Sequence, residues 1–404
     1  MTYNPYTFNT GDVINAERIN SLAADDLTDS NIASTGSITW TKVNKTGSSV
    51  TNFSNFPTQS GNADKYLSSD GANYIWQAIS GGSGKGMFFK EDPNTVAFTK
   101  TGNGTAQVKA GTLIDVSGAT VAFMSATSIT MPSLAAGTDY AIWVSASGTI
   151  QATTNFSSPP SAGSWRKIGG FHYAPGGNAT AQSGGNTTAQ INEYSFWDLK
   201  FRPACPDPRG MTLIANTFWA DIYLTGVDAI TNGSSKYNVT IADSSSPPKV
   251  PTMYGGNGTT TYGSYTWFEA MELATAFGKK CPTQQEFMAL AYGTTEASSR
   301  GTDPVTTQMS TTDDNFTSKW GVIQAAGCMW AWGRDRGGPA AASSWNANTD
   351  GRGSEYNAPN AGRFGGPWSD GANSGSRCSN WPVAASFSAI NASSRFVCDH
   401  LQLD

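Results

Sequence analysis

Charged residues are scarce in this sequence, and their scarcity excludes one large class of function. They make up 14% of the 404 residues, against about 25% in ordinary soluble domains. The formal net charge is −5, and lysines and arginines do not gather in any segment. Because a protein needs grouped cations to neutralise nucleic-acid phosphates, we expect no nucleic-acid partner.

Long apolar runs are missing as well. No segment approaches the about 20 apolar residues that cross a bilayer as a helix, so we expect no membrane insertion. Residues 1–12 are polar and lack the apolar core of a signal peptide. We therefore expect the chain to be synthesised in the cytoplasm of the cell that produces it.

Histidine patterns that hold metals or activate nucleophiles are absent from the sequence. His172 and His400 are its two histidines, and neither stands in an HxH or HExxH motif. We interpret both as structural and expect neither a metal nor another cofactor. A structural calcium ion in the turn Asp350–Glu355 is a weaker alternative to an ordinary Asx turn, because the segment lacks the full calcium-loop pattern.

The cysteines show no CxxC spacing, and their odd number cannot pair completely within one chain. Synthesis in a cytoplasm favours thiols, so reduced structural cysteines are the preferred interpretation. Bridges from Cys378 to Cys398 or from Cys281 to Cys398 stay open. The five cysteines are Cys205, Cys281, Cys328, Cys378 and Cys398.

Acidic residues offer one catalytic arrangement that the sequence does not exclude, a carboxylate pair that hydrolyses a glycosidic bond. The sequence gives no distances between these residues, and the repeated β-helix texture of many polysaccharide-degrading enzymes is absent. We therefore expect no catalytic residues and no enzyme. The carboxylates considered are Asp221, Asp228, Asp313, Asp314, Asp335, Asp350 and Glu355.

Aromatic residues and glycine, by contrast, are plentiful. The chain has 13 Trp, 14 Tyr and 19 Phe, which argues against disorder because aromatic side chains contribute large burial energies. Its 44 glycines, with Ser, Thr and Asn between short apolar runs, favour short strands and turns over long helices. The length fits two or three domains.

Changes of texture along the chain predict three regions. Residues 1–83 combine a short helix begun by Asp12, a hairpin that turns at Asp70-Gly71 and a Gly/Ser linker, and they resemble the attachment segments of phage tail fibres. Residues 84–194 alternate apolar and polar residues in short runs between turns, which predicts an all-β module of the sandwich or prism type. Residues 195–404 are richer in Trp and form the third region.

Two helices are predicted in that third region. Thr266 and Thr283 each precede a helical pattern, and Glu269 follows Thr266 three residues later as in a capping box. Gly278 and Gly293 end the two patterns. The predicted fold class is mostly β, with an α+β C-terminal domain.

Several long peptides in the second half of the chain carry a resemblance to a known family. In order and spacing they resemble the major tropism determinant family, the tail-tip receptor-binding proteins of phages that carry a diversity-generating retroelement. The resemblance is continuous through 195–404 and weaker in the middle region. The peptides are Arg166–Gly176 (RKIGGFHYAPG), Pro206–Leu213 (PDPRGMTL), Phe218–Leu224 (FWADIYL), Ser235–Asp243 (SKYNVTIAD) and Arg395–Leu401 (RFVCDHL).

This resemblance implies a C-type-lectin-like fold for 195–404, a homotrimer, and a place in the virion at the tip of a tail fibre. It implies a host surface protein or glycan as receptor, and other tail or baseplate proteins as partners of the N-terminus. In the family the last strands and loops contact the receptor. Carried over by register, the receptor-binding positions are Pro367, Ser369, Asp370, Gly371, Asn373, Asn380, Pro382, Val383, Phe387, Ala389, Asn391 and Ala392.

This assignment predicts that the receptor-binding positions from Asn380 to Asn391 are exposed to solvent. Phe387 should be an exposed aromatic anchor for the receptor. Trp368, Trp381 and Arg395 should instead be structural anchors, because large side chains with polar tips find partners in a loop-rich fold. The positions expected to be exposed on one face are Asn380, Pro382, Val383, Phe387, Ala389 and Asn391.

Other functions stay open beside receptor binding. The lectin-like fold also resembles formylglycine-generating oxidases, for which Cys328 and Cys378 are the only candidate pair, and a carbohydrate-degrading tail enzyme is a further alternative. A purely structural fibre shaft does not explain the Trp-rich, non-repetitive C-terminal half. The chain departs from the family pattern at Cys378, Ser393 and Phe396, among others, which leaves open whether a retroelement diversifies it.

Overall fold

The computed structural model describes residues 65–69, 74–78, 86–340, 345–347 and 352–403. The chain divides into two units, Met1–Ser80 and Gly81–Asp404. In the first unit, strands β1 (Lys65–Ser69) and β2 (Tyr74–Ala78) pair antiparallel, which confirms the predicted hairpin. The helix predicted after Asp12 lies outside the described residues.

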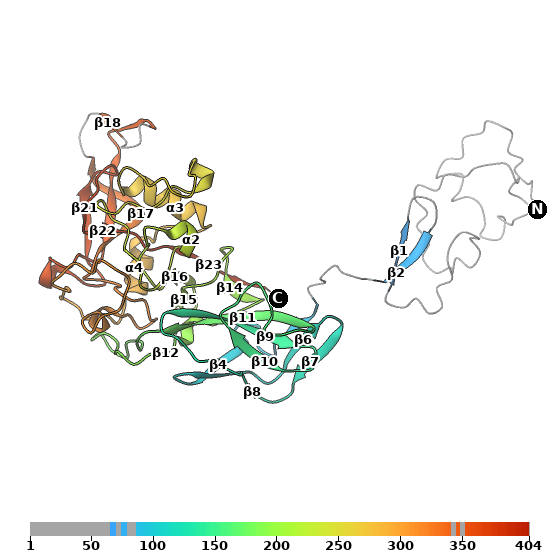
Figure 1. Ribbon diagram of the computed structural model, residues 1–404. Helices are drawn as coiled ribbons and strands as arrows, with labels where there is room; N and C mark the ends of the chain where they lie inside the picture. The colour runs from blue at the N-terminus through green and yellow to red at the C-terminus, as the bar shows by residue number, and fades with distance from the viewer. Residues whose placement is uncertain (1–64, 70–73, 79–85, 341–344, 348–351, 404) are drawn as a thin grey trace, which may run out of the picture. The chain divides into compact units, whose positions relative to one another are not determined.

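The first part of the second unit consists of short strands around one core, as predicted (Figure 1). Alternation turns every second side chain inward, so Thr112, Ile114 and Val116 of β6 are buried. The strands are β3 (Phe88–Phe89), β4 (Phe98–Gly102), β5 (Thr105–Val108), β6 (Thr112–Val116), β7 (Ala119–Phe123), β8 (Thr127–Ser128), β9 (Thr138–Ser145), β10 (Ile150–Thr153), β11 (Trp165–Ala174), β12 (Gln190–Ile191) and β13 (Trp197–Asp198).

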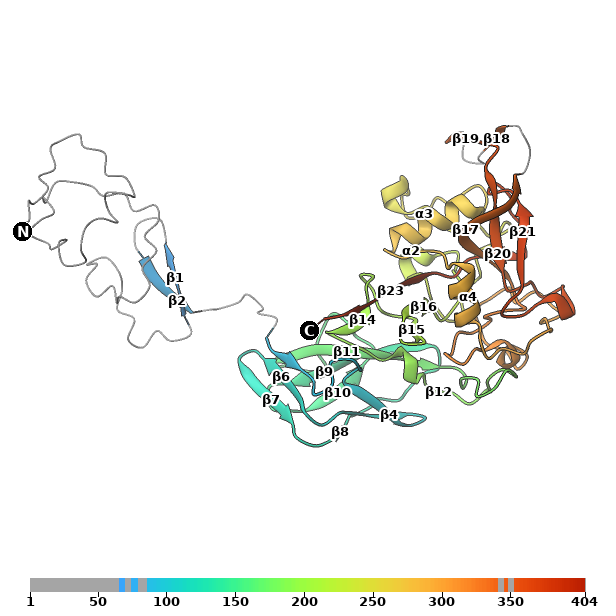
Figure 2. The ribbon, with the colours of Figure 1, turned by 180° about the vertical axis from the view of Figure 1, so that it is seen from behind.

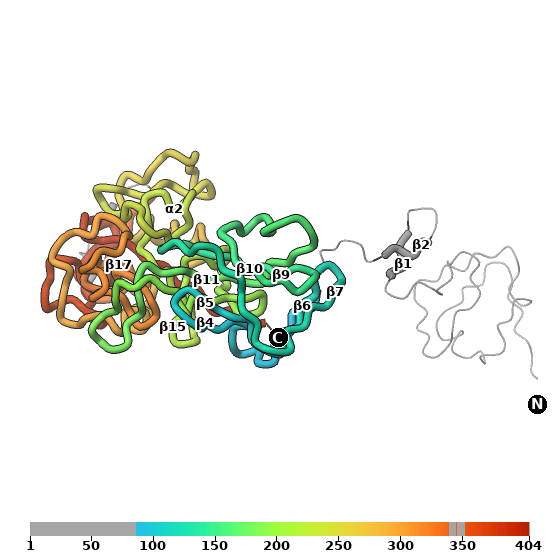
Figure 3. Tube along the Cα trace, turned by 60° about the horizontal axis from the view of Figure 1, so that its bottom comes forward, coloured from blue at the N-terminus to red at the C-terminus, as the bar shows by residue number. Residues whose placement is uncertain are grey.

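These strands form three antiparallel sheets. Their orders are β3-β6-β7, β4-β5-β8 and β10-β9-β11-β12, and β13 also pairs with β11. Figure 3 shows β6, β7, β9 and β10 gathered at one end of this unit. A short 3-10 helix, η1 (Glu193–Ser195), leads out of the sheets, and the Asn192 side chain caps it.

The second part contains two four-stranded sheets, β14-β23-β16-β15 and β21-β20-β17-β22, and a separate hairpin, β18-β19. The last strand, β23, pairs with β14, so the two ends of this part lie side by side (Figure 2). Its strands are β14 (Phe201–Pro203), β15 (Met211–Ile214), β16 (Phe218–Asp221), β17 (Trp330–Ala340), β18 (Trp345–Ala347), β19 (Ser354–Tyr356), β20 (Pro359–Phe364), β21 (Ser379–Val383), β22 (Ala392–Ser393) and β23 (Val397–Gln402).

Helices begin where the sequence predicted them. Thr266 and Thr283 are the N-caps of α3 (Trp267–Ala276) and α4 (Gln284–Leu290), and each forms a capping box with the Glu three residues later. The sequence did not predict α2 (Ala229–Asn232), which is one turn long and capped by Asp228. The 3-10 helices of this part are η2 (Thr252–Tyr254), η3 (Asp313–Phe316) and η4 (Gly371–Asn373). Among the described residues, no helix has the length and apolar character needed to cross a bilayer.

The sheet that contains β17 and β20 has a helix against each face. Trp330 and Trp332 of β17 lie in one apolar cluster with Leu273 of α3. Ala331, between them on the opposite face, lies in another cluster with Phe287 of α4. Because side chains alternate along a strand, this sheet is buried on both faces and holds its loops on a rigid support.

Buried polar contacts cross the predicted boundary between residues 194 and 195. His172 Nε2 lies 2.9 Å from the Tyr223 hydroxyl oxygen, and Nδ2 of Asn192 donates to the Trp320 carbonyl at 3.0 Å. Lys90 and Asp198 form a buried ion pair. The middle strands and the lectin-like part are therefore joined by a polar, enclosed interface.

His400 makes the stability of this unit sensitive to acid. Its Nδ1 accepts a hydrogen bond from Trp219 Nε1 at 2.8 Å, and its Nε2 is buried without a partner. Burial, assisted by the positive charge of Lys90, lowers the pKa of His400 below its ordinary 6.5. The unfolded chain consequently binds this proton more readily than the folded one, and stability is lost as the pH falls.

We expect the free energy of unfolding to fall less steeply from about pH 7 to about pH 5 in His400→Asn than in the unmodified protein. Asparagine keeps an acceptor for Trp219 but does not titrate. Denaturant unfolding at a series of pH values measures the two slopes, and equal slopes would show that His400 does not contribute.

Candidate functional site

The predicted receptor-binding positions lie in three segments. The first follows β20 and includes η4, the second is β21, and the third is the loop that leads into β22. Strand β21 pairs with β20, and β22 pairs with β17, so one sheet carries the last two segments. The first segment is held by Ser299, whose hydroxyl donates to the Trp368 carbonyl at 2.7 Å and accepts from Gly371 N at 3.0 Å.

Most of these positions reach the surface. Phe387 is the largest of the exposed ones, with 41% of its surface accessible. Ser369, Gly371, Asn373 and Pro382 are also exposed. The half-buried positions are Asp370, Asn380, Ala389 and Asn391.

Three positions are buried, and for Val383 the expected exposure was wrong. Val383 is 8% exposed because it lies opposite Ala361 in the sheet and packs into the α3 cluster. Ala392 is fully buried, where β22 pairs with Trp330 of β17. Pro367 is buried at a bridge to Cys328. Sequence register placed these residues in the right segments but did not show which way each side chain turns.

Arg363 of β20 links two of the predicted positions. Its guanidinium carbon lies 5.0 Å from the centre of the Phe387 ring, and its Nη2 donates to Asn380 Oδ1 at 3.3 Å. The Trp330 ring also lies near this guanidinium, at 5.2 Å, and the Trp330 backbone N–H donates to the Asn391 carbonyl at 2.9 Å. The structure thus brings Asn380 and Phe387 to one arginine and links Asn391 to it through Trp330.

The three predicted anchors differ in burial. Arg395 is fully buried, and its guanidinium donates to four backbone carbonyls. Trp381 is half-buried and packs edge-on against Phe364 at 5.8 Å. Trp368 is half-buried against the small apolar cluster that contains Met329.

Sequence reasoning missed several residues at this end of the molecule. Arg363 went unnoticed because an isolated arginine carries no local pattern. Ile390 is 53% exposed beside the predicted positions. Trp345 and Tyr356, paired across the β18-β19 hairpin at 5.2 Å, are 70% and 55% exposed. The one sequence signal for that pair would have been two aromatic residues placed to face each other across a short hairpin.

The acidic residues weighed for glycosidic hydrolysis are mostly engaged in structural contacts. Asp221 pairs with Lys279, Asp228 with Lys249, and Asp313 with Arg300. Glu355 binds Arg336 with both oxygens at 2.5 and 2.7 Å. Asp335 accepts the backbone N–H of Gln284 at 2.7 Å at the start of α4. Asp350 lies outside the described residues, so the turn considered for calcium is described only in part.

Cys328 and Cys378, the pair considered for an oxidase, sit in surroundings that disfavour the thiolate. Burial raises the pKa of Cys328 well above its ordinary value and that of Cys378 to about 11. All five cysteines are free thiols. Neither bridge considered for Cys398 is present, and Cys205 Sγ donates to the Asp207 carbonyl at 3.2 Å. No group of three metal-ligating side chains occurs among the described residues.

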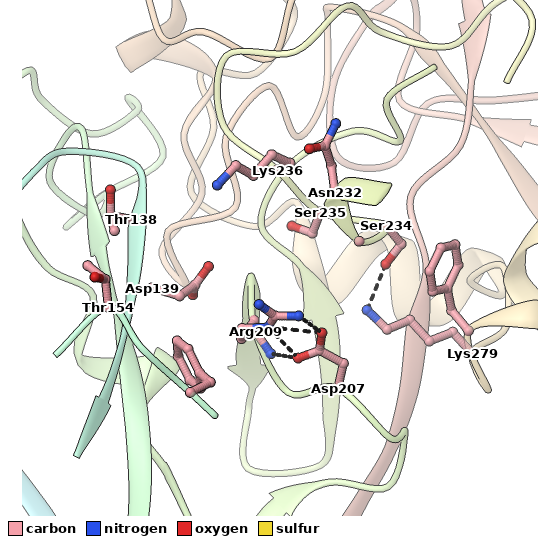
Figure 4. Close-up of a pocket in the computed structure, with 13 residues that line it drawn as sticks. Thr138, Asp139, Thr154, Asp207, Arg209, Asn232, Ser234, Ser235, Lys236 and Lys279 are labelled. Atoms are coloured by element: carbon pink, nitrogen blue, oxygen red, sulfur yellow. Dashed lines mark hydrogen bonds and ion pairs between the residues drawn. The ribbon is translucent and has the colours of Figure 1, made fainter. Parts of the chain in front are cut away.

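A cavity of about 200 Å³ lies away from the predicted positions (Figure 4). Asp139 from β9 lines it, and Asp207, Arg209 and Lys279 line it from the lectin-like part. These charges are largely satisfied within the protein, since Arg209 pairs with Asp207 and Lys279 donates to Ser234 at 2.8 Å. None of the predicted receptor-binding residues contributes to this cavity.

Comparisons with known proteins agree with the fold and with the resemblance. A family model described as the Mtd second domain matches residues 96–198. The tail fiber receptor-binding protein of Bordetella phage BPP-1 is 56% identical over 328 residues, which span 79% of this chain and 86% of that protein. Solved structures of the major tropism determinant P3c and U1 variants match with a TM-score of 0.77 at 55% and 56% identity, covering 79% of this chain and 87% of each.

The architecture is that of a C-type-lectin-like module joined to a β-rich second domain, as predicted. The chain belongs to the major tropism determinant family of phage tail fibre receptor-binding proteins. The predicted family and fold class are thereby confirmed.

Proposed function

We propose that this protein binds a receptor on the host-cell surface and so determines which hosts its phage recognises. The observation that carries the proposal is 56% identity to a tail fibre receptor-binding protein over most of both chains. The binding face consists of the exposed and half-buried predicted positions, with Phe387 as its aromatic anchor. A rigid sheet that presents variable loop residues suits this role.

The assembly proposed around this face is a homotrimer at the tip of a tail fibre in the virion. Residues 1–83 attach it to other tail or baseplate proteins, and residues 84–194 connect them to the lectin-like domain at 195–404. The chain is made in the host cytoplasm. When several copies of the protein face one cell, the first copy that binds holds the others close to further receptors. Overall avidity then exceeds the affinity of a single site by about 10²–10⁴-fold, even when each site is weak.

Adhesion in this proposal involves no turnover and needs no cofactor. The oxidase alternative requires a reactive cysteine, whereas Cys328 is fully buried with a raised pKa. The glycosidase alternative requires two carboxylates free to meet a substrate, whereas Asp221, Asp313 and Glu355 are each paired with a cation. A calcium ion at 350–355 would compete with Arg336 for Glu355.

Replacing Phe387 by Ala tests the face. We expect adsorption to host cells to weaken by about 2 kcal/mol or more per site, because a partly exposed aromatic at the centre of an interface is a typical hot spot. The free energy of unfolding should fall by no more than about 2 kcal/mol, because the side chain is partly exposed and loses mainly its contact with the Arg363 guanidinium. Purified protein binding to cells, together with thermal unfolding, measures both quantities.

Phe89→Ala is the matched control. Phe89 is 49% exposed on β3 in the middle part of the chain, so the same truncation there should leave adsorption unchanged. Equal adsorption by the Phe387→Ala and unmodified proteins would remove Phe387 from the binding face. Loss of folding with full adsorption per folded molecule would make it a core residue.

A further inference from the structure

Arg363 occupies an unusual place for a charged side chain. It lies in the middle of the β21-β20-β17-β22 sheet, opposite Trp332 on one side and Asn380 on the other. Only 7% of its surface is accessible. It is nevertheless next to the proposed binding face, because its guanidinium carbon lies 5.0 Å from the centre of the Phe387 ring.

Aromatic rings surround its guanidinium group. The guanidinium carbon is 5.2 Å from the ring centre of Trp330, 5.8 Å from that of Trp332 and 5.0 Å from that of Phe387. The negative faces of such rings attract a cation, by about 0.5–2 kcal/mol for each favourable contact. This attraction holds the arginine in place but supplies no hydrogen-bond acceptor.

Hydrogen bonds and counter-ions are largely missing around this group. Within the described parts of the chain, its one side-chain hydrogen bond is the 3.3 Å contact from Nη2 to Asn380. Nε is buried without a partner, and no carboxylate among the described residues forms an ion pair with Arg363. Nη1 donates to no described residue and is not fully enclosed, so part of this nitrogen can be reached from the surface.

An unpaired buried cation is costly, and the protonation state reflects that cost. Burial lowers the pKa of Arg363 to about 10, an effect that the carboxylate of Asp370 opposes without touching it. The group nevertheless stays protonated at neutral pH. Buried charges in proteins are normally paired, so an anion that reached this group would recover part of the desolvation cost.

We propose that Arg363 binds an acidic side chain of a host-surface protein when the receptor docks, an inference that rests on the proposed function. An aspartate or glutamate carries its carboxylate at the end of a slim, flexible arm, which can reach the guanidinium of an arginine that is only 7% exposed. The carboxylate of an acidic sugar is attached directly to a broad ring, which suits so little exposed a group less well. Nη1, which donates to no described residue, would donate a charge-assisted hydrogen bond to one oxygen of that carboxylate.

Substituting Arg363 by Met, which has similar volume and no charge, tests this inference. We expect binding to host cells to weaken roughly 30-fold or more, because truncating one partner of an interfacial charge pair is costly. The remaining binding should depend less on salt concentration. Thermal stability should stay equal or rise, because an unpaired buried charge has been removed. Arg377→Met, which removes an exposed arginine from the same region, should change none of these properties.

Binding by Arg363→Met equal to that of the unmodified protein would overturn the inference. Phe387→Ala, measured in parallel, separates the two proposals. If Phe387→Ala loses binding and Arg363→Met does not, the proposed binding face is supported and the proposed acidic partner of Arg363 is wrong. If Arg363→Met is much less stable but binds as well per folded molecule, Arg363 has only a structural role, packing against the surrounding aromatic rings.

The host cell can be altered instead of the protein, which keeps the test independent of folding. We expect amidation of surface carboxylates with a carbodiimide and an amine to abolish binding of the unmodified protein, and protease treatment of the cells to do the same. Periodate oxidation of surface sugars should leave binding intact. Full binding to amidated cells, or loss after periodate but not after protease, would contradict an acidic protein side chain as the partner.

Discussion

Arg395→Met should lower the free energy of unfolding by about 3–5 kcal/mol, one of the two largest effects we expect from a single substitution in this protein. The arginine is completely buried, and its two terminal nitrogens donate to the carbonyls of Asp221, Ile222, Ile323 and Gln324 at 2.6–3.2 Å. Methionine fills the space but leaves these acceptors facing an apolar group. Each buried acceptor that loses its partner costs about 1–3 kcal/mol, and some recover by relaxation.

A lysine at the same position should also fail to restore stability. An ammonium group is compact, whereas the planar guanidinium reaches carbonyls of two chain segments at once. Denaturant unfolding of Arg395→Met and Arg395→Lys, beside Arg377→Met as an exposed control, measures the difference. A loss below about 1 kcal/mol in Arg395→Met would show that water or a backbone shift replaces the arginine.

Asp221→Asn should cost about 3–5 kcal/mol, because it leaves a buried lysine without its counter-ion. Asp221 Oδ1 and Lys279 Nζ are 2.5 Å apart, and both side chains are almost wholly enclosed. Burial acts to lower the pKa of Lys279, but the charge and hydrogen bond of Asp221, together with the nearby Cys205 and Cys398, leave that pKa raised. Lys279 therefore stays protonated inside the protein.

The neighbouring residue provides a matched comparison. Lys280 pairs with Asp399 at 2.8 Å, but these side chains are 49% and 70% exposed. Asp399→Asn should change stability by about 1 kcal/mol or less, as is usual for surface pairs. Replacing Asp221 and Lys279 together by Leu and Met should recover most of the loss, because no unpaired charge remains. If the double variant is as unstable as Asp221→Asn, packing rather than charge controls this position.

The buried contacts of Arg395 and Lys279 share one partner, Asp221. Arg395 holds the backbone carbonyl of Asp221, and Lys279 holds its carboxylate. Substitutions at positions that share a partner are not additive. We therefore expect the combined loss in an Asp221→Asn, Arg395→Met variant to be smaller than the sum of the two single losses.

The sequence by itself determined the elements that short-range interactions define. Thr266 and Glu269 are three residues apart and satisfy each other's backbone at the start of α3, so their spacing alone predicts the cap. The two strands on either side of Asp70-Gly71 were predictable because apolar and polar residues alternate along each of them and a turn sequence lies between them. Peptides such as PDPRGMTL, kept in order, identified the family and hence the segments proposed to bind the receptor.

Only the tertiary structure decided which side chains in those segments face outward and what supports them. Val383 turns inward because the register of β21 against β20 sets its direction, and register depends on strands distant in sequence. Arg395 meets Ile222 across 173 residues, and Arg363 meets Phe387 through a loop whose path no local pattern fixes. A charge buried without a partner becomes visible only when every neighbour is known, because burial and pairing are properties of the folded chain and not of any segment.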